Sequence, residues 1–418
     1  MRFGLIGEHL THSFSPALHA MLGTPDYELC ELALGDLPAL FRGRDFDGLN
    51  VTIPYKEAVI PYLDELSPEA AAIGAVNTVI RRGDRLVGYN TDYAGLTSLI
   101  RSSGISLRGK KVLILGSGGT SRTALAAAKD AGAREILRVS RTPGGETVSY
   151  ADAATSHADA DVIINTTPVG MYPHAGDVPI DLALFSNLSG VIDVVYHPLR
   201  TALALAARAR GIPAVCGLRM LVAQAAGASA LFRGTPADDD VAARVLHALL
   251  LAKENLVLIG MPSAGKTAVG REAAALLGRR FVDTDALIEE KCGKTPACLI
   301  EQCGEPAFRE AEARVIAEIS AETGLVIATG GGAVIRRENA DALRANGRLF
   351  WLDRPAEKLI PDESRPLSSS AEQLRALYAA RLPLYRAAAD CRIDGRGDVS
   401  TVAADCAARF KNLIEREC

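Results

Sequence analysis

Two glycine-rich segments of different design could each hold the phosphates of a nucleotide. Residues 260–267 read Gly-Met-Pro-Ser-Ala-Gly-Lys-Thr and follow the apolar run 255–259. This is the pattern of a phosphate-binding loop, whose backbone N–H groups surround the phosphates while its lysine and threonine bind phosphate oxygens and Mg²⁺. Residues 116–119, Gly-Ser-Gly-Gly, also follow an apolar run. Two such loops on one chain indicate two enzymes joined end to end.

The loop at 116–119 lies in a pattern that is typical of a dinucleotide site. Apolar periodicity predicts strands at 111–115 and 135–139 and an Ala-rich helix at 120–132 between them. Such a βαβ unit is half of a Rossmann sheet. Its glycines would let a pyrophosphate approach the helix N-terminus.

The end of the second strand indicates which dinucleotide is bound. Folds that bind NAD usually place a carboxylate there, whereas this chain has Ser140, Arg141 and Thr142. A guanidinium can bind the 2′-phosphate that a carboxylate would repel, so the sequence predicts NADP. The alternative is a surface arginine with no such role.

Charged residues after the loop at 260–267 suit phosphoryl transfer. A strand is expected at 281–285, which would put Asp283 and Asp285 on one face, although Asp285 could instead cap the following helix. Further candidates are Arg309 and Glu312, the glycines 330–332 after an expected strand at 325–329, Arg365, and Arg381. Phosphoryl transfer depends on positioning and cations, and arginine binds both oxygens of a carboxylate.

The elements that position these residues predict an α/β protein of several domains. Strands are expected at 2–7, 48–53, 78–81, 161–165 and 190–195, and long helices at 218–252. We therefore expect an α/β domain at 1–100, a Rossmann NADP domain at 101–217, helices at 218–252 and a P-loop domain at 253–418. The resemblances given below imply that the first α/β domain is substrate-binding, that the helices return to it, and that the last domain is a P-loop kinase α/β/α domain.

Composition limits the classes of partner. The chain has 418 residues, more than one hydrophobic core usually supports. Its net charge of −4 argues against nucleic acid, and no apolar run approaches the roughly 20 residues that span a membrane. The N-terminus has no signal-peptide pattern, so a cytoplasmic protein with small-molecule partners is expected. Cys292, Cys298 and Cys303 are expected to be reduced thiols, with zinc binding as the alternative.

Short motifs occur along almost all of residues 1–250. They are Ser13-Phe-Ser15-Pro-x-x-His19, the segments 50–56, 74–78, 88–92 and 165–171, Asp193-x-x-Tyr196, and Gly217-x-x-Met220-Leu-Val-x-Gln224. Together they resemble shikimate dehydrogenase, with Ala20 in place of an expected asparagine.

This resemblance implies roles for individual residues. Lys56 and Asp92 would be the catalytic pair. The substrate would be held by Ser13, Ser15, Thr52, Asn77, Asn90, Tyr196 and Gln224. NADP would be held by Gly116, Gly118, Gly119, Ser140, Arg141, Thr142, Thr166, Gly217 and Met220.

Residues 255–415 resemble shikimate kinase. By that resemblance ATP would be bound by Gly260, Ser263, Ala264, Gly265, Lys266, Thr267 and Arg365. Thr267 and Asp283 would hold Mg²⁺, Asp283 through water, and Asp285 and the lid residue Arg365 would be catalytic. Shikimate would be bound by Asp285, Arg309, Gly331, Gly332 and Arg381. Ser263 stands where many relatives have glycine, and the lid segment 361–364 is short.

The expected function is therefore bifunctional. The first part would reduce 3-dehydroshikimate to shikimate with NADPH, and the second would phosphorylate shikimate to shikimate 3-phosphate with ATP and Mg²⁺. One alternative is a ligand-responsive regulator that has lost turnover, against which the intact Lys56, Asp92, Lys266, Asp283 and Asp285 argue. Another is oxidation of quinate or shikimate with NAD.

Overall fold

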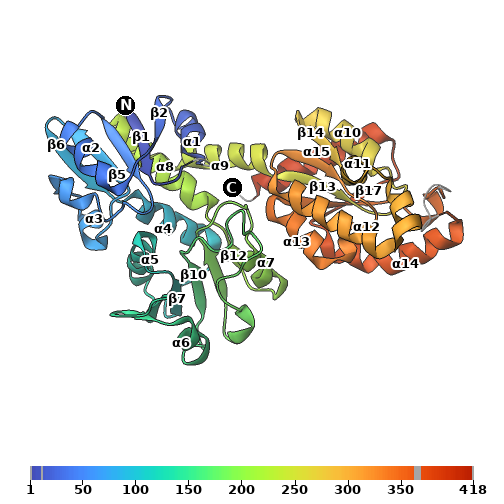
Figure 1. Ribbon diagram of the computed structural model, residues 1–418, viewed down its shortest axis with the longest axis horizontal. Helices are drawn as coiled ribbons and strands as arrows, with labels where there is room; N and C mark the ends of the chain where they lie inside the picture. Colours follow the sequence, from blue (N-terminus) through green and yellow to red (C-terminus); the bar gives the residue numbers. More distant parts are fainter. Residues whose placement is uncertain (1, 11–12, 362–368, 417–418) are drawn as a thin grey trace. The chain divides into compact units, whose positions relative to one another are not determined.

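The computed structural model describes residues 2–10, 13–361 and 369–416 of the chain. Contacts divide the chain into two units, Met1–Leu246 and His247–Cys418. The division falls within helix α9 (Asp239–Lys253), ahead of the predicted boundary at 253. Unit 1 has two sheets and unit 2 has one (Figure 1). Each unit also has its own buried core.

The first sheet of unit 1 is mixed and has the order β2-β1-β3-β5-β6-β4. Its strands are β1 (Phe3–Gly7), β2 (Tyr27–Glu31), β3 (Gly48–Val51), β4 (Glu65–Leu66), β5 (Thr78–Arg82) and β6 (Arg85–Tyr89). Its helices are α1 (Ser15–Met21), α2 (Leu37–Gly43), α3 (Pro68–Ile73) and α4 (Thr91–Ser103), with short 3-10 turns at Leu34–Asp36 and Ile60–Tyr62. The three strands predicted here are confirmed, except that β3 ends before residues 52 and 53.

The second sheet of unit 1 is parallel throughout and has the order β12-β11-β10-β7-β8-β9. Its elements are β7 (Lys111–Leu115), α5 (Gly119–Asp130), β8 (Glu135–Val139), β9 (Thr147–Val148), α6 (Tyr150–Thr155), β10 (Val162–Asn165), a 3-10 turn (Leu182–Leu184), β11 (Gly190–Asp193), α7 (Ala202–Ala209) and β12 (Ala214–Val215). Every residue of β7 is buried, as expected for a parallel strand covered on both faces. The strand order reverses between β10 and β7, and ligands bind at the carboxyl ends of strands at such a point.

The stretch predicted as long helices at 218–252 forms two helices, α8 (Leu218–Arg233) and α9. Gly234 ends α8 in the left-handed conformation. Helix α8 packs closely on α4, because a Cβ on Gly95 would lie 2.7 Å from the carbonyl oxygen of Met220. At its other end the ring of Phe232 stacks on Phe3 of β1, with centroids 4.9 Å apart.

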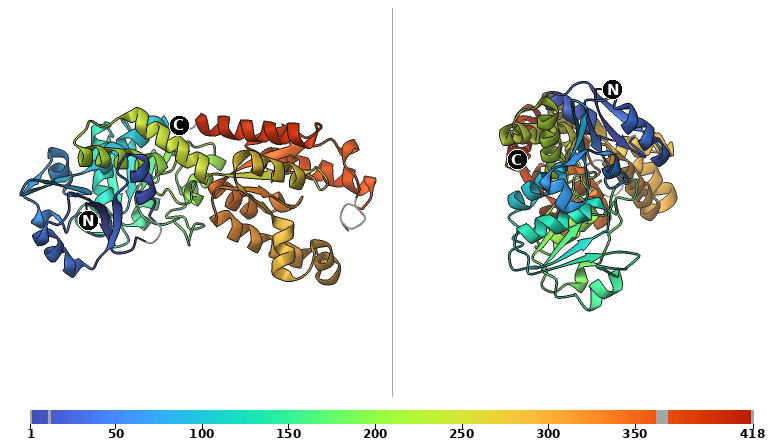
Figure 2. Two further views of the ribbon diagram at one scale, coloured as in Figure 1. Left: turned by 90° about the horizontal axis from the view of Figure 1, so that it is seen from above. Right: turned by 90° about the vertical axis from the view of Figure 1, so that its left-hand side faces the viewer.

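Unit 2 has one parallel sheet of order β14-β15-β13-β16-β17, with helices on both faces (Figures 1 and 2). Its strands are β13 (Asn255–Ile259), β14 (Arg280–Asp283), β15 (Leu325–Ala328), β16 (Gly347–Asp353) and β17 (Cys391–Asp394). Its helices are α10 (Lys266–Leu277), α11 (Thr284–Cys292), α12 (Pro296–Ala321, kinked at Gly304), α13 (Arg337–Asn346), α14 (Ala371–Ala388) and α15 (Val399–Glu415), with 3-10 turns at Ala333–Ile335 and Ala356–Lys358. None of the described helices is long and apolar enough to cross a membrane.

Candidate active sites

Lys56 and Asp92 form an ion pair in unit 1. The Lys56 Nζ lies 2.5 Å from Asp92 Oδ2, and both side chains are largely buried. The other carboxylate oxygen of Asp92 accepts a hydrogen bond from Asn77 Nδ2 at 2.9 Å. The structure thus brings three of the predicted residues together, with the lysine ammonium at one end of the chain of contacts.

Local packing fixes the position of Lys56. Its neighbour Tyr55 is buried and donates a hydrogen bond to the Leu32 carbonyl, and the Lys56 carbonyl accepts from Val76 N at 2.8 Å. A Cβ on Gly119 would lie 3.4 Å from the Cβ and Cδ of Lys56. The glycine loop expected to hold the cofactor therefore lies directly against the lysine.

The other residues predicted to bind the first substrate occupy several elements. Asn90 caps α4 by accepting from Tyr93 N, and its amide donates to the Ala75 carbonyl. Gln224 donates to the Leu221 carbonyl in α8. Ser13 accepts from the backbone of Ser15, Thr52 follows β3, and Tyr196 packs its ring 5.6 Å from Phe14. No described contact joins this set to Lys56, so their substrate roles stay predictions.

At several glycines of the predicted NADP site, a side chain would clash with neighbouring atoms. Gly116 has φ +114°, and a Cβ there would lie 2.7 Å from Thr166 Oγ1, which donates to the Leu115 carbonyl. A Cβ on Gly217, at the start of α8, would lie 2.0 Å from the Val194 carbonyl oxygen. Gly118 caps α5 and faces open space. These features leave room for a pyrophosphate at the N-terminus of α5.

The end of β8 carries no carboxylate. Ser140 is buried and its hydroxyl accepts from Thr142 N at 3.2 Å, whereas Arg141 and Thr142 are exposed. The Arg141 side chain makes no hydrogen bond or ion pair with the described residues, so its guanidinium is available to a 2′-phosphate. Met220 is buried, and its carbonyl oxygen faces Gly95.

In unit 2, the loop after β13 has the geometry of a phosphate-binding loop. Gly260 and Gly265 have positive φ values of +144° and +94°, and Ser263, with φ +60°, shares this left-handed region. Lys266 is buried, and its Nζ donates to the Gly260 carbonyl at 2.9 Å and the Met261 carbonyl at 2.8 Å. Ala264 is buried in the same loop.

Two predicted metal residues meet beside this loop. Thr267 Oγ1 donates to Asp283 Oδ2 at 2.7 Å, as a hydroxyl and carboxylate that share a Mg²⁺ site would be arranged. The prediction that Asp283 and Asp285 share a strand face is wrong, because β14 ends at Asp283. Asp283 Oδ1 accepts from Asp285 N at 3.0 Å and caps α11, so Asp285 lies in the first helical turn and is not the cap.

The predicted carboxylate-binding arginine Arg309 is buried and held on two sides. Its Nη1 donates to Glu312 Oε2 at 2.8 Å, and its Nη2 and Nε donate to Glu305 Oε1 at 2.9 and 3.2 Å. A Cβ on Gly332 would lie 2.2 Å from Nη1 and 2.5 Å from Nη2. The guanidinium therefore lies directly against residue 332, where any side chain would have to displace it.

Glu312 links the other predicted substrate residues. Burial raises its pKa, the guanidinium groups of Arg309 and Arg381 lower it, and the carboxylate of Asp285 raises it further. A Cβ on Gly330 would lie 2.8 Å from Asp285 Oδ1 and 2.9 Å from Glu312 Oε1. Asp285, Arg309 and Arg381 thus converge around one buried carboxylate.

Tyr385 connects the glycine triplet to the second buried arginine. Its hydroxyl donates to the Gly331 carbonyl at 2.5 Å and lies beside Arg381, and burial raises its pKa to about 12. A Cβ on Gly331 would lie 2.6 Å from Pro262 Cδ, so the triplet also lies against the phosphate-binding loop. Arg365 lies outside the described residues.

Comparisons with known proteins match a different family model to each unit. Residues 5–79 match the family model of the shikimate dehydrogenase substrate binding domain. Shikimate dehydrogenase (NADP(+)) of Moorella thermoacetica is 36% identical over an alignment of 288 positions, which covers 63% of this chain and 96% of that protein. The chain belongs to the shikimate dehydrogenase family.

Solved structures of that family agree with the fold of unit 1. Shikimate dehydrogenase 1 from Peptoclostridium difficile has a TM-score of 0.55 at 35% identity, covering 60% of this chain and 98% of that one. The enzyme from Thermus thermophilus in complex with NADP(H) and shikimate has a TM-score of 0.50 at 35% identity, covering 59% and 99%.

Residues 262–411 match the shikimate kinase family model. The chain is therefore a fusion of a shikimate dehydrogenase with a shikimate kinase, and so a bifunctional enzyme of the shikimate pathway. Glu305 and Tyr385 of the kinase unit were given no role from the sequence. Glu312 was a candidate because it follows Phe308 and Arg309 by a short spacing, but it too was given no role.

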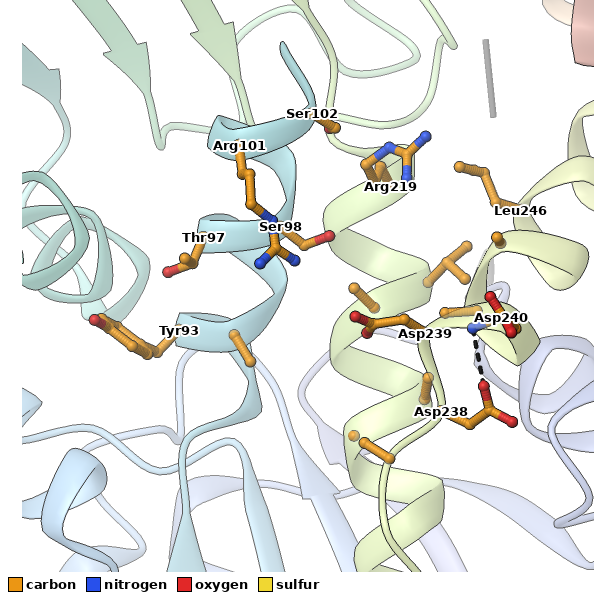
Figure 3. Close-up of a pocket in the computed structure, with 18 residues that line it drawn as sticks. Tyr93, Thr97, Ser98, Arg101, Ser102, Arg219, Asp238, Asp239, Asp240 and Leu246 are labelled. Carbon is orange, nitrogen blue, oxygen red and sulfur yellow. Dashed lines mark hydrogen bonds between the residues drawn. The ribbon is translucent and has the colours of Figure 1, made fainter. Parts of the chain in front are cut away.

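The dehydrogenase unit also contains a cavity of about 620 Å³. It is lined by α4, α8 and the segment that begins α9, including Arg101, Arg219 and Asp238 to Asp240 (Figure 3). Lys56 and Asp92 do not line it. In the described residues no group of three or more His, Cys, Asp or Glu is arranged to hold a metal ion.

Proposed function

We propose that the chain catalyses two consecutive reactions of the shikimate pathway. Unit 1 reduces 3-dehydroshikimate to shikimate with NADPH, and unit 2 phosphorylates the 3-hydroxyl of shikimate with ATP and Mg²⁺. The observation that carries the proposal is that one chain holds both the buried Lys56–Asp92 pair and a phosphate-binding loop beside the buried Arg309 and Arg381. The product of the first reaction is the substrate of the second.

In the first reaction the Lys56 ammonium supplies a proton. NADPH, when bound, supplies the hydride that reduces the ketone. As the carbonyl carbon accepts the hydride, negative charge develops on oxygen, and Lys56 Nζ stabilises this charge and protonates it. Asp92 keeps the ammonium in place, and Asn77 fixes the Asp92 carboxylate at its other oxygen. The glycine loop that would hold the cofactor lies against the Lys56 side chain at Gly119.

In the second reaction the kinase residues position charges rather than form covalent intermediates. Asp285, in the first turn of α11, accepts the proton of the shikimate 3-hydroxyl. Arg309 and Arg381 bind the shikimate carboxylate, with Gly331 and Gly332 beneath it. ATP with Mg²⁺, when bound, supplies the phosphoryl group. Lys266 neutralises charge on its β and γ phosphates, while Thr267 and Asp283 hold the cation.

The two assignments are tested together on the purified full-length chain. Incubation with 3-dehydroshikimate, NADPH, ATP and Mg²⁺, but no added shikimate, should yield shikimate 3-phosphate. Lys56→Ala should stop this sequence, and added shikimate should restore phosphorylation. Binding of shikimate without turnover in either half would instead indicate a regulator.

The choice of cofactor and first substrate requires a separate comparison. The rates with NADP and with NAD should be measured for shikimate and for quinate in the oxidative direction. The absence of a carboxylate after β8 supports NADP. Faster oxidation of quinate with NAD would overturn that part of the proposal.

A further inference from the structure

Arg354, which directly follows β16 in the kinase unit, is half-buried, and one N–H of its charged guanidinium has no partner among the described residues. Its Nε is buried without a hydrogen-bond partner, and the side chain makes no hydrogen bond or ion pair with any described residue. A buried N–H that lacks a partner costs free energy unless a ligand or water supplies one. Arg354 belongs to no recognised sequence motif, so no role could be predicted for it from the sequence.

The nearest carboxylate is already occupied. The adjacent Asp353 accepts from Arg392 Nη2 at 2.6 Å and Nε at 2.8 Å, and from the Tyr378 hydroxyl at 3.2 Å. These contacts direct the Asp353 side chain to β17 and α14. Among the described residues, no carboxylate pairs with Arg354 at the carboxyl end of β16.

This cation lies beside the phosphate-binding loop. Arg354 Nη1 is 3.7 Å from the point where a Cβ on Gly265 would stand, and Gly265 precedes Lys266 at the N-terminus of α10. The first loop residue, Gly260, also lies against this strand, because a Cβ added to it would lie 2.7 Å from the Leu352 carbonyl oxygen. The end of β16 therefore forms one wall of the loop.

The order of the strands indicates which part of the nucleotide passes this wall. The acceptor groups follow β14 and β15, which lie on one side of β13, whereas β16 and β17 lie on the other. The γ-phosphate must face the acceptor, so the rest of the phosphate chain runs toward β16. Gly395, which follows β17, lies next to Arg354. A Cβ added to Gly395 would lie 3.4 Å from the Arg354 Cβ.

We propose that Arg354 binds the α- and β-phosphates of ATP from the β16 side, opposite the shikimate site. This inference rests on the proposed kinase function and adds a cation to that site besides Lys266. Arginine suits this position because its planar fork can bind two phosphate oxygens at once.

The test uses the full-length chain with Arg354→Ala, Arg354→Lys and a control, Arg337→Ala. Arg337 is exposed in the same unit, and its ion pair with a described residue is the one with Asp341 at 3.3 Å. Calorimetry would measure binding of ADP and of inorganic tripolyphosphate, and kinase assays would give separate KM values for ATP and shikimate. Thermal unfolding and the NADPH-dependent activity would check that the variants fold.

Loss of a charge-assisted contact predicts that Arg354→Ala weakens ADP and tripolyphosphate binding by about 10- to 100-fold and raises the KM for ATP similarly. The KM for shikimate should not change. The ADP and tripolyphosphate affinities of Arg354→Lys should lie between those of the unaltered chain and those of Arg354→Ala. ADP and tripolyphosphate binding equal to that of Arg337→Ala would overturn the inference. Weakened ADP binding with unchanged tripolyphosphate binding would overturn it too, because the contact would then be with the nucleoside. Failure of the proposed function would show separately, as no shikimate phosphorylation by the unaltered chain.

Discussion

Replacing Gly332 by alanine should damage the kinase half through one contact. The added Cβ would stand 2.2 Å from Arg309 Nη1, so the guanidinium must move by about 1.2 Å to reach the 3.4 Å of an ordinary contact. Glu305 and Glu312 hold that guanidinium at 2.9 and 2.8 Å in a buried position, so it cannot move without losing one of them. Residue 332 has φ −104°, which alanine adopts without strain, so the effect would come from this contact.

The magnitude follows from the bonds that Arg309 would make to the substrate carboxylate. A charge-assisted hydrogen bond contributes about 1.5–3 kcal/mol, which corresponds to about a 10- to 100-fold change in an equilibrium constant. Gly332→Ala should therefore raise the KM for shikimate by about that factor, with the KM for ATP and the dehydrogenase activity unchanged. Kinase kinetics on the full-length chain, at saturating ATP and varied shikimate, would measure this.

A double-mutant cycle with Arg309→Ala identifies the cause. If the added methyl group acts by displacing the guanidinium, Gly332→Ala should have little further effect once Arg309 has been removed. An equally large effect in both backgrounds would refute the reasoning, as would an unchanged KM for shikimate in the single variant.

Three further predictions concern the dehydrogenase unit. Lys56→Ala should lower the rate of 3-dehydroshikimate reduction by about 10²–10⁴-fold, the usual contribution of a general acid or base, and leave phosphorylation intact; retained reduction would contradict its role. Arg141→Ala should lower the preference for NADP over NAD by about 10- to 100-fold in kcat/KM, since one charge-assisted contact is lost, and an unchanged ratio would count against the 2′-phosphate contact. Burial lowers the pKa of His19 from 6.5 to about 4, so the folded state binds fewer protons than the unfolded state and stability falls as pH falls from 6.5 toward 4. The free energy of unfolding should therefore be about 2 kcal/mol lower at pH 5 than at pH 7 because of His19. Urea unfolding at both pH values should show that His19→Phe removes this difference. An equal decrease in the unaltered chain and in His19→Phe would argue against it.

The strands that carry the nucleotide loops could be predicted because their sequences are apolar on both faces. β7 has the predicted bounds, and all five of its residues are buried. By contrast, β2 was not predicted. Only Tyr27 of its residues is buried, and it is held in place by pairing with β1 at the edge of the sheet. Such a strand is determined by long-range backbone hydrogen bonds, which leave little trace in local sequence.

The prediction that Asp283 and Asp285 share a strand face was also wrong because a contact within the folded chain decides the structure there. An alternating pattern through residue 285 is compatible with a strand, but it does not reveal where an aspartate side chain will accept a backbone N–H. Asp283 does so, with Asp285 N as donor at 3.0 Å, and begins a helix. The two carboxylates consequently take different positions: Asp283 contacts Thr267, and Asp285 lies near Glu312. This separation suits one carboxylate for the cation and the other for the hydroxyl better than a shared strand face would.

Motifs identified residues that belong to a recognisable local sequence pattern. They could not identify residues that are distant in sequence and come together only because their strands are neighbours in the sheet. Arg354 is more than 80 positions from Lys266, and nothing in the segment around it indicates phosphate binding. Its position beside Gly265 arises because β16 pairs with β13 in register, which brings Leu352 to Gly260 and the next residues to the end of the loop. Its lack of a partner arises because Asp353 is bound to Arg392 on the neighbouring strand. Both conditions are tertiary, so the case for a second cation at the phosphates depends on the fold and not on the motif.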